Sequence, residues 1–496
     1  MVCSAVVIAA QIQYLQHGWI NRDSLYYLES ARLLVAGEWH QAIKVFNWPL
    51  YSALIAALHK VTGLTLHHSA QVLSVIFFGI ATYSFLTIIQ LAGGGRKELV
   101  AGSLILFSAG YMVGDVLAML MRDQGFWAFF LASIVFFIRY YKSATYKDAF
   151  LWQISAILAT LFRIEGITYL LALPITLLFV QQHPFSLRLR NFLRCNFLTI
   201  IAGASITMAI LISQDMSIQN FGRLNEIFTV DFYHGLTKNI TDRSHIMAHD
   251  VLGRYLDEYA TQGILLIFLY IVITKIILAT GIINSGLALA SVLSKKIQLD
   301  VAAFRVLKAT AILSFLNFYL IITKVFVLSG RYVLALSFIL MVLASFSLAY
   351  LFRYLVTVST SKKKWGVIIL LAFMLVGFAK NIWPKDPSNT YCQDAVVWLR
   401  EKNKDRKPVF YDDSRIRYYA GVPYIGSWDD NWLKVSTAIK DNTLKPYSFL
   451  VISHSEEYIE REKILAEQLP EYREIKRFAG PKSKKSIVIY EKINNE

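Results

Sequence analysis

Long apolar runs dominate the chain up to about residue 383. A run of about 17–25 apolar residues is long enough to cross a bilayer as a helix. The pattern therefore predicts about eleven transmembrane helices. Their approximate ranges are 2–17, 69–92, 99–115, 124–141, 149–162, 166–181, 196–214, 263–285, 308–327, 333–352 and 365–382. The charges of Arg163 and Glu165 separate two of the shorter runs and end both at one surface.

Three longer segments follow a different pattern. Residues 18–67 carry two amphipathic stretches, and residues 215–262 form a polar loop. Residues 384–496 alternate helical patterns with β-rich runs, which predicts a small soluble α/β domain. The helical patterns lie at about 391–403, 430–441 and 457–469, and the β-rich runs at Val409–Tyr411, Phe449–Ile452 and Ile487–Tyr490. We therefore expect two domains, a polytopic α-helical one over 1–383 and a soluble one over 384–496.

The composition supports a membrane protein. Of the 496 residues 56% are hydrophobic and 17% are charged, which argues against an ordinary soluble enzyme. The three cysteines are far apart in sequence and predict no disulfide framework. No CxxC or Cys/His cluster indicates a structural zinc site.

The net charge of +16 has a topological explanation. Basic residues gather in alternate loops, which is typical of loops that face the cytoplasm. They are Arg96 and Lys97; Arg139, Lys142 and Lys147; Arg188, Arg190 and Arg194; Lys295, Lys296, Arg305 and Lys308; Arg353 and Lys362 to Lys364. This alternation predicts a cytoplasmic N-terminus and an extracytoplasmic C-terminal domain, and it makes a nucleic-acid partner unnecessary. A cleavable signal peptide is not indicated, because no basic n-region precedes the first run.

Asp23 follows the first predicted span directly. A carboxylate at a membrane surface can accept the proton of an attacking hydroxyl. The alternative is that Asp23 or Ser24 caps the helix-like run that begins at Leu25. That run is amphipathic and contains Tyr26 and Tyr27, which is typical of a helix lying in the membrane interface.

Other charges interrupt the apolar pattern near span ends. Asp115, Arg122 and Asp123 lie in one short outer loop. Charged residues at membrane depth cost about 2.5–3.5 kcal/mol on insertion scales and usually serve a site or a partner. The alternative is an Arg122–Asp123 surface pair that only ends two helices.

Two arginines suit an anionic ligand, because guanidinium presents a fixed fork of donors and stays charged. Arg163 could bind a phosphate, or it could form an internal pair with Glu165. Arg331 could do the same while Tyr332 stacks on a sugar. The alternative for this second pair is a snorkelling arginine beside an interfacial tyrosine.

The joint position of these residues is more informative than any one of them. All are predicted at the outer surface of the membrane: Asp23, Asp115, Asp123, Arg163, Glu165 and Arg331. Carboxylates and guanidiniums on one face suit a reaction between a hydroxyl or amine acceptor and a donor with a lipid-linked phosphate. A transporter or flippase of lipid-linked saccharides would favour inverted repeats, broken helices and midplane charges. A non-catalytic scaffold for envelope assembly is the third possibility, and it needs no convergent acids.

With these residues the chain resembles a known family, the polytopic GT-C glycosyltransferases. It is most similar to the bacterial branch of protein mannosyltransferases and lipid A aminoarabinose transferases. The resemblance covers about residues 1–380. The motifs that carry it are Arg22-Asp23-Ser24-Leu25-Tyr26-Tyr27, Trp48-Pro49-Leu50-Tyr51, Arg122-Asp123, Arg163 and Arg331-Tyr332.

The resemblance implies an inverting transferase in a bacterial inner membrane, with interfacial helices in its first outer loop. Asp23 would be the general base, and a polyprenyl-phosphate-linked sugar would be the donor. Arg163 and Arg331 would bind the donor phosphate. Acceptor or sugar binding would fall to Asp123, Glu165, Tyr27 and Tyr332. The 215–262 loop would close over the donor, and the C-terminal domain would shape the side of a lipid, glycan or protein acceptor.

The sequence departs from the family pattern in two places. Protein mannosyltransferases have adjacent Asp-Glu in the first loop, whereas Ser24 follows Asp23 here. The oligosaccharyltransferase branch uses a metal with Asp-x-Asp motifs, and no such pair occurs at Asp23. We therefore expect neither a metal nor another cofactor.

Overall fold

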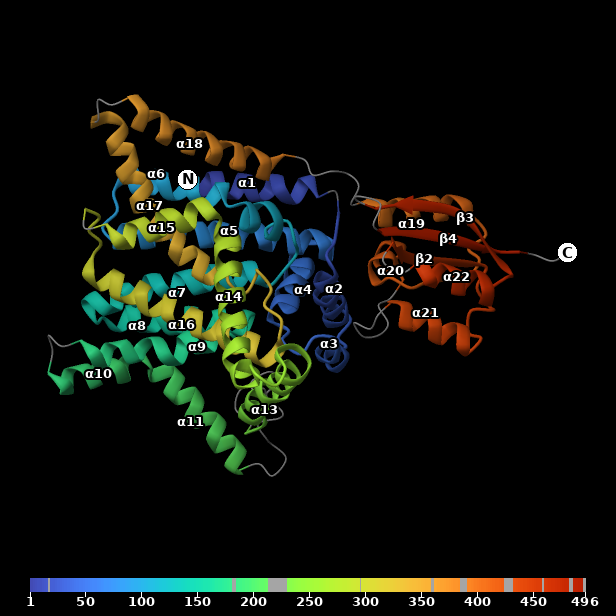
Figure 1. The fold of residues 1–496 in the computed structure, drawn as a ribbon, viewed down its shortest axis with the longest axis horizontal. Helices are drawn as coiled ribbons and strands as arrows, with labels where there is room; N and C mark the ends of the chain where they lie inside the picture. The colour runs from blue at the N-terminus through green and yellow to red at the C-terminus, as the bar shows by residue number, and fades with distance from the viewer. Residues whose placement is uncertain are drawn as a thin grey trace. The chain divides into compact units, whose positions relative to one another are not determined.

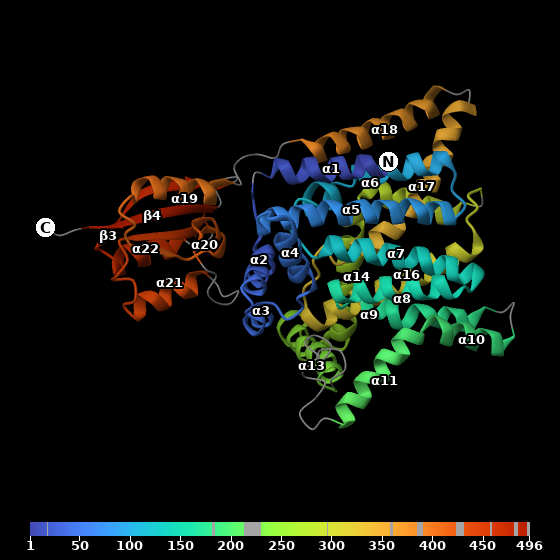
Figure 2. The same cartoon turned by 180° about the vertical axis from the view of Figure 1, so that it is seen from behind.

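The computed structural model is mainly helical and contains a four-stranded sheet. It describes residues 1–16, 18–180, 184–212, 230–294, 296–357, 361–383, 390–422, 431–456, 459–480 and 485–493. Contacts within the chain define two units. The first combines Met1–Tyr14 with Asn47–Trp383, and the second combines Leu15–Phe46 with Pro384–Glu496. Figures 1 and 2 show the helices of the first unit from both sides.

Helices are the regular secondary structure of the first unit in its described residues. Its N-terminal half contains α1 (Val2–Leu15), α4 (Leu50–Thr62), α5 (Leu66–Leu91), α6 (Arg96–Ser108), η1 (Gly110–Val116), α7 (Asp123–Ser143), α8 (Tyr146–Phe162), α9 (Gly166–Ala172) and η2 (Leu173–Phe179). Then follow α10 (Phe185–Cys195), α11 (Phe197–Ile212), α13 (Val230–Ile246), η4 (Met247–Leu252), η5 (Asp257–Tyr259), α14 (Ala260–Thr280), α15 (Ile282–Leu293), α16 (Val301–Val325), α17 (Leu334–Thr357) and α18 (Ser361–Ile382).

The chain is a multi-pass membrane protein. Among the described residues, six helices are long and apolar enough to cross a membrane, or seven if a bent pair counts as one span. The six lie at Leu66–Leu91, Asp123–Ser143, Asp257–Thr280, Val301–Val325, Leu334–Arg353 and Lys364–Ile382. The bent pair, α6 with η1, covers the predicted span 99–115. The other four predicted spans coincide with shorter helical segments, namely α1, α8, α9 with η2, and α11.

Local sequence signals explain where several helices begin. Thr65, Thr145 and Asp300 precede α5, α8 and α16, and each accepts a backbone N–H from the first turn. Such caps satisfy donors that the helix itself leaves without partners. Helices α5, α7, α8 and α16 then lie side by side in Figures 1 and 2. The absence of a side chain at Gly125 lets α7 approach the Phe162 ring of α8 closely.

Amide side chains bond backbone carbonyls at the break between α6 and η1 and just after η1. The axis bends by 50° there, which leaves backbone carbonyls outside the regular helical ladder. Asn381 donates to the Phe107 carbonyl at 2.9 Å, and Gln13 donates to the Leu117 carbonyl at 2.6 Å. Gln124 donates to the carbonyl of Met119 at 2.8 Å. Non-helical backbone at membrane depth persists only where protein groups satisfy it, and these amides do so.

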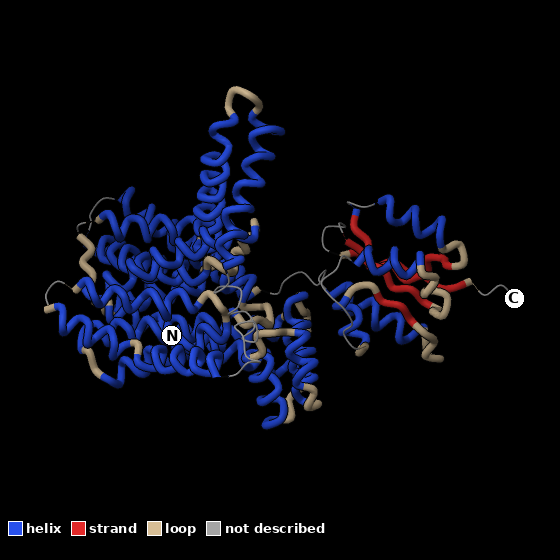
Figure 3. The backbone as a smooth tube through the Cα atoms, turned by 90° about the horizontal axis from the view of Figure 1, so that it is seen from below, coloured by secondary structure: helices blue, strands red, loops and turns tan. Residues whose placement is uncertain are grey.

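The second unit brings the two ends of the sequence together. It contains α2 (Arg22–Val35) and α3 (Trp39–Val45) from the first loop. From the tail come α19 (Tyr391–Lys402), β1 (Val409–Tyr411), α20 (Ser414–Ala420), α21 (Asn431–Lys440), β2 (Phe449–Ser455), α22 (Ile459–Gln468), β3 (Tyr472–Ala479) and β4 (Lys485–Lys492). The strand order is β1-β2-β4-β3; β1 pairs parallel to β2, and the other pairs are antiparallel. Figure 3 shows the strands, coloured red, in this unit.

The small α/β fold predicted for the tail is confirmed, with two elements that the sequence did not indicate. Helix α20 is short, and strand β3 has Tyr472 as its only fully buried residue. The strand lies at the edge of the sheet, so its outward side chains are charged and the alternating apolar pattern is missing. The amphipathic stretches of residues 18–67 form α2, α3 and α4, but contacts place α2 and α3 with the tail. The predicted domain boundaries stay predictions.

Candidate active site

A buried ion network in the first unit centres on Arg163. Its Nη2 lies 2.7 Å from Oε1 of Glu165 and its Nε lies 3.3 Å from Oε2, so the pair is bidentate. Its Nη1 donates to Asp123. The side chains of Arg163 and Asp123 are only 5% and 2% exposed. The internal pair that the sequence left open is therefore present, and Asp123 extends it.

Three helix ends place these groups. Asp123 is the first residue of α7, Arg163 is the residue after α8, and Glu165 immediately precedes α9. Tyr332, just before α17, covers the network, with its ring centroid 4.3 Å from Cζ of Arg163. The indole of Trp48 donates to the Thr160 carbonyl at 3.2 Å, at the end of α8. The structure thus brings together four of the residues that the sequence predicted for the site.

The network keeps Glu165 ionised. Burial alone raises the pKa of this carboxyl, but the charge and hydrogen bonds of Arg163 have the larger effect and lower the pKa to about 2. Arg122 lowers the pKa of Glu165 as well. Glu165 is therefore an acceptor or an ion-pair partner near neutral pH, and it does not supply a proton.

Arg331 contacts the turn Met121–Asp123, which precedes α7. Its Nη1 is 2.7 Å from Sδ of Met121, two residues before Asp123. Its Nε donates to Oγ of Ser329 at 3.4 Å. The sequence does not indicate Tyr111, which lies next to Arg331's neighbour Gly330. A Cβ atom on Gly330 would be only 2.7 Å from the Tyr111 hydroxyl. The signal that could have indicated it is a tyrosine four residues before Asp115 in an apolar run.

The turn between α8 and α9 depends on Gly166. A Cβ atom there would lie 2.7 Å from both Cα and N of Thr160. We expect Gly166→Ala to destabilise the protein by about 1–3 kcal/mol, because the backbone must move and drag Arg163 and Glu165 with it. Denaturant titration of the purified protein in mild detergent measures the loss. Gly203→Ala is the matched control, since nothing lies within 4 Å of its Cβ position; equal stability of both variants would contradict the prediction.

In the second unit, Asp23 lies in the first turn of α2 and is half-buried. The N-cap is Asn21, whose side-chain oxygen accepts from the hydroxyl of Ser24. Neither Asp23 nor Ser24 is therefore the cap, because the helix begins at Arg22, earlier than the sequence pattern suggests. Asp23 lies at the positive end of the helix dipole, where a carboxylate is stabilised.

Tyr27 serves the packing of this segment. It is 5% exposed, and its ring meets Phe46 edge-on with centroids 4.9 Å apart. This contact holds α2 against the end of α3. The sugar-binding role expected for Tyr27 stays a prediction.

The segment that carries Asp23 is also held by the tail within the same unit. Arg22 lies 3.2 Å from a carboxylate oxygen of Asp413. The Tyr419 hydroxyl accepts the backbone N–H of Ile20 at 2.9 Å and donates to the Gly18 carbonyl at 3.2 Å. These bonds make α20 the support of the start of α2.

The neighbouring acids of α20 differ in role. Asp413 caps the helix by accepting the N–H of Arg415 at 2.7 Å. Asp412 is 1% exposed and accepts the N–H and hydroxyl of Ser453 through one oxygen. Burial and the nearby charge of Asp413 raise the pKa of Asp412 to about 7.

Asp412 makes the second unit more stable in acid. Its folded pKa of about 7 exceeds the 3.8 of an unperturbed carboxyl, so folding favours the protonated form. Its stabilisation is full below pH 3.8 and is lost as the pH rises through 7. We expect Asp412→Asn to reduce the fall in unfolding temperature between pH 5 and 7.5, measured by thermal unfolding. Asp441 is exposed, so Asp441→Asn should show the same fall in unfolding temperature as the wild type. A fall of wild-type size in Asp412→Asn would contradict the raised pKa of Asp412.

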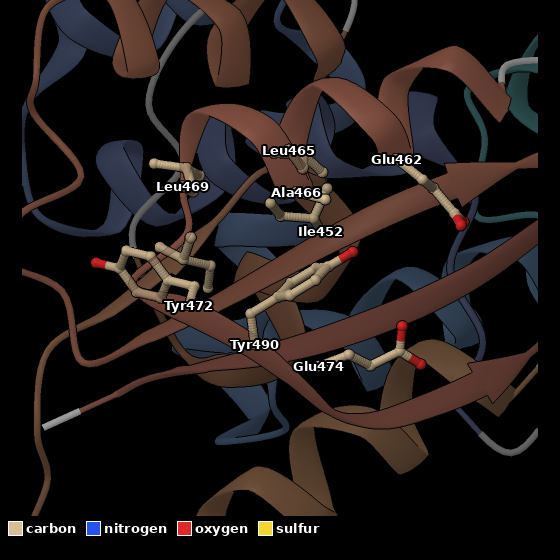
Figure 4. Close-up of a pocket in the computed structure, with 9 residues that line it drawn as sticks. Ile452, Glu462, Leu465, Ala466, Leu469, Tyr472, Glu474 and Tyr490 are labelled. Carbon is tan, nitrogen blue, oxygen red and sulfur yellow. The ribbon is translucent and has the colours of Figure 1, made fainter.

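A cavity of about 270 Å³ lies between α22 and the sheet (Figure 4). Leu465 of α22 and Leu469, which follows that helix, line it with Tyr472 and Tyr490 of the sheet. Glu462 and Glu474 stand at one end, and both carboxylates pair with Arg477, at 2.9 and 2.8 Å. His454 lies 3.0 Å from the Tyr490 hydroxyl and 3.3 Å from Glu462. The acids are thus part of a structural network, and we assign the cavity no role.

The lid role expected for residues 215–262 stays a prediction. Residues 215–229 of the predicted lid lie outside the described residues, and most of residues 230–259 lie in α13, η4 and η5. Asp115 is exposed in η1. In the described part of the chain, no three His, Cys, Asp or Glu side chains lie close enough together to hold a metal ion.

The fold and the buried network define a multi-pass membrane protein with a charged cluster at the ends of its helices. No protein-family model matches the chain, and no curated protein matches it either. Among solved structures the chain is similar to the arabinofuranosyltransferase AftD from mycobacteria, at 13% identity and a TM-score of 0.49. The match covers 100% of this chain and 40% of that chain, so the chain spans less than half of the mycobacterial protein. The roles proposed below rest on residues of this chain.

Proposed function

We propose that the protein is an inverting glycosyltransferase that uses a polyprenyl-phosphate-linked sugar. The acceptor is a lipid, a glycan or a protein at the outer face of a bacterial inner membrane, and no metal or other cofactor takes part. The C-terminal domain lies on the outer side of the membrane, where the reaction takes place.

One observation carries the proposal. Both predicted phosphate ligands lie at the turn Met121–Asp123, Arg163 through its pair with Asp123 and Arg331 through its contact with Met121. Two guanidiniums at one turn suit a phosphate, because their permanent positive charges stabilise anionic oxygens. Ionisable groups in a membrane domain are costly, and their concentration here is a functional-site signal.

The proposed chemistry assigns one role to each group. The acceptor hydroxyl attacks the anomeric carbon while Asp23 takes its proton. The bond between this carbon and the phosphate oxygen breaks, and polyprenyl phosphate leaves with the electron pair. Arg163 and Arg331 stabilise the charge that develops on that oxygen. Asp123, Glu165, Tyr27 and Tyr332 bind sugar or acceptor, with Glu165 acting as an ionised acceptor.

The bent pair α6–η1 favours a second candidate function. A span broken by 50° is a feature of transporters, whose binding sites form at discontinuous helices. A flippase of lipid-linked saccharides would use the same arginines to hold the phosphate but would break no glycosidic bond.

One experiment separates the two functions. Purified protein in sealed vesicles is given a polyprenyl-phosphate donor with a radiolabelled sugar and extracts of candidate acceptors. The proposal expects labelled product together with free polyprenyl phosphate. Movement of intact donor between leaflets, without any consumption, would support the flippase and overturn the transferase.

A further inference from the structure

A cavity of about 670 Å³ lies beside α10 in the first unit, and none of the residues of the proposed reaction lines it. Its polar lining comes from Ser186, Arg190 and Arg194. Its apolar lining includes Leu189 and Leu193 of the same helix. None of its lining residues is acidic. The cavity therefore combines a positive end with an apolar wall.

The arginines of this cavity are arranged for an external anion. Nη1 of Arg194 donates to the Ala144 carbonyl at 2.9 Å, and its Cζ lies 4.0 Å above the Tyr146 ring. These contacts fix the guanidinium and leave its other N–H groups available. Arg190 is exposed, and within the described ranges it has no acidic or hydrogen-bonding partner.

The exposed side of α10 is apolar. Phe185, Leu189 and Leu193 are 62%, 39% and 48% exposed, and their spacing of four residues places them on one face. The opposite side is anchored, because Cys195 is buried and the Tyr140 hydroxyl donates to the Asn191 carbonyl at 2.7 Å. A fixed amphipathic helix with arginines beside an exposed apolar face is typical of a segment in the lipid interface.

We propose that this cavity binds an anionic glycerophospholipid. The headgroup phosphate accepts from Arg190 and Arg194 and from the Ser186 hydroxyl, while an acyl chain lies along Leu189 and Leu193. The apolar wall argues for a lipid rather than free phosphate. The absence of a lining carboxylate argues against a zwitterionic headgroup, whose amine would have no partner. The sequence predicts this segment on the cytoplasmic side, where the leaflet is anionic.

Equilibrium binding of fluorescent phosphatidylglycerol and phosphatidylcholine to the full protein in mild detergent tests the proposal. We expect tighter binding of phosphatidylglycerol. Arg190→Ala should weaken it about five-fold, the effect of one charge near a membrane surface, and should weaken phosphatidylcholine binding less, because that headgroup carries no net negative charge. Arg190 is exposed, so this variant keeps its fold.

The matched control is Arg96→Ala, an exposed arginine outside the cavity, which should bind both lipids as the wild type does. Equal affinity for the two lipids, or no effect of Arg190→Ala, would overturn the proposal. Preferential displacement of the probe by polyprenyl phosphate would also overturn it, because the cavity would then hold the donor lipid. The readout is binding and does not depend on transferase activity.

Discussion

Asp23→Asn is expected to lower kcat for glycosyl transfer by about 10²–10⁴-fold, the usual contribution of a positioned general base. The amide keeps the shape of the side chain but cannot take the acceptor's proton. The side chain lies in the first turn of α2, so the change also weakens its interaction with the helix dipole. That loss is about 0.3–1 kcal/mol and is too small to unfold the protein. Release of radiolabelled product from a polyprenyl-phosphate donor measures the effect.

Glu29→Gln is the matched control for this variant. Glu29 lies on the same helix and pairs with the exposed Arg32 at 2.8 Å. An ion pair with one exposed partner contributes about 0.2–1 kcal/mol, so the control should fold and turn over normally. Wild-type kcat in a folded Asp23→Asn protein would remove Asp23 from the chemistry.

Arg163→Met is expected to have the largest effect on stability, a loss of about 3–5 kcal/mol. The substitution leaves Asp123 and Glu165 as buried or half-buried carboxylates without their guanidinium. The cost comes mainly from these uncompensated charges and less from lost attraction. Denaturant titration in mild detergent measures the difference.

Two further variants make this result specific. Arg139→Met removes an exposed arginine from α7 and should cost less than about 1 kcal/mol. The double variant Arg163→Met/Glu165→Gln should recover part of the lost stability, because one uncompensated charge is gone. Unchanged stability of Arg163→Met would show that the network does not hold the ends of α7, α8 and α9 together.

The sequence predicts the helices of this fold well because long apolar runs have a single physical explanation in a chain of this composition. It does not predict α15, since a twelve-residue helix between two spans looks like the continuation of its neighbour. It does not predict the bend after Ser108 either. The Phe107 carbonyl at that bend is bonded by the amide of Asn381, which comes from a distant part of the chain.

The candidate site is predictable only in part, for a related reason. Loop charges and sidedness suggest that Asp123, Arg163 and Arg331 share one face of the membrane. Which atoms meet depends on how each helix is rotated and how far it extends. The contact of Arg331 with Met121 joins residues 210 positions apart, and no local pattern records it. The resemblance to a known family supplied roles for these residues but not their contacts.

The pair between Arg22 and Asp413 can form only late in synthesis of the chain. These residues are 391 positions apart, so α2 emerges from the ribosome long before its partner α20 exists. At about 5–20 residues per second, the delay is roughly 20–80 s. During this time the apolar face of α2 has no support from the tail. The segment that carries Asp23 is therefore the last part of the N-terminal region to reach its final structure, and nascent chains released early would lack it.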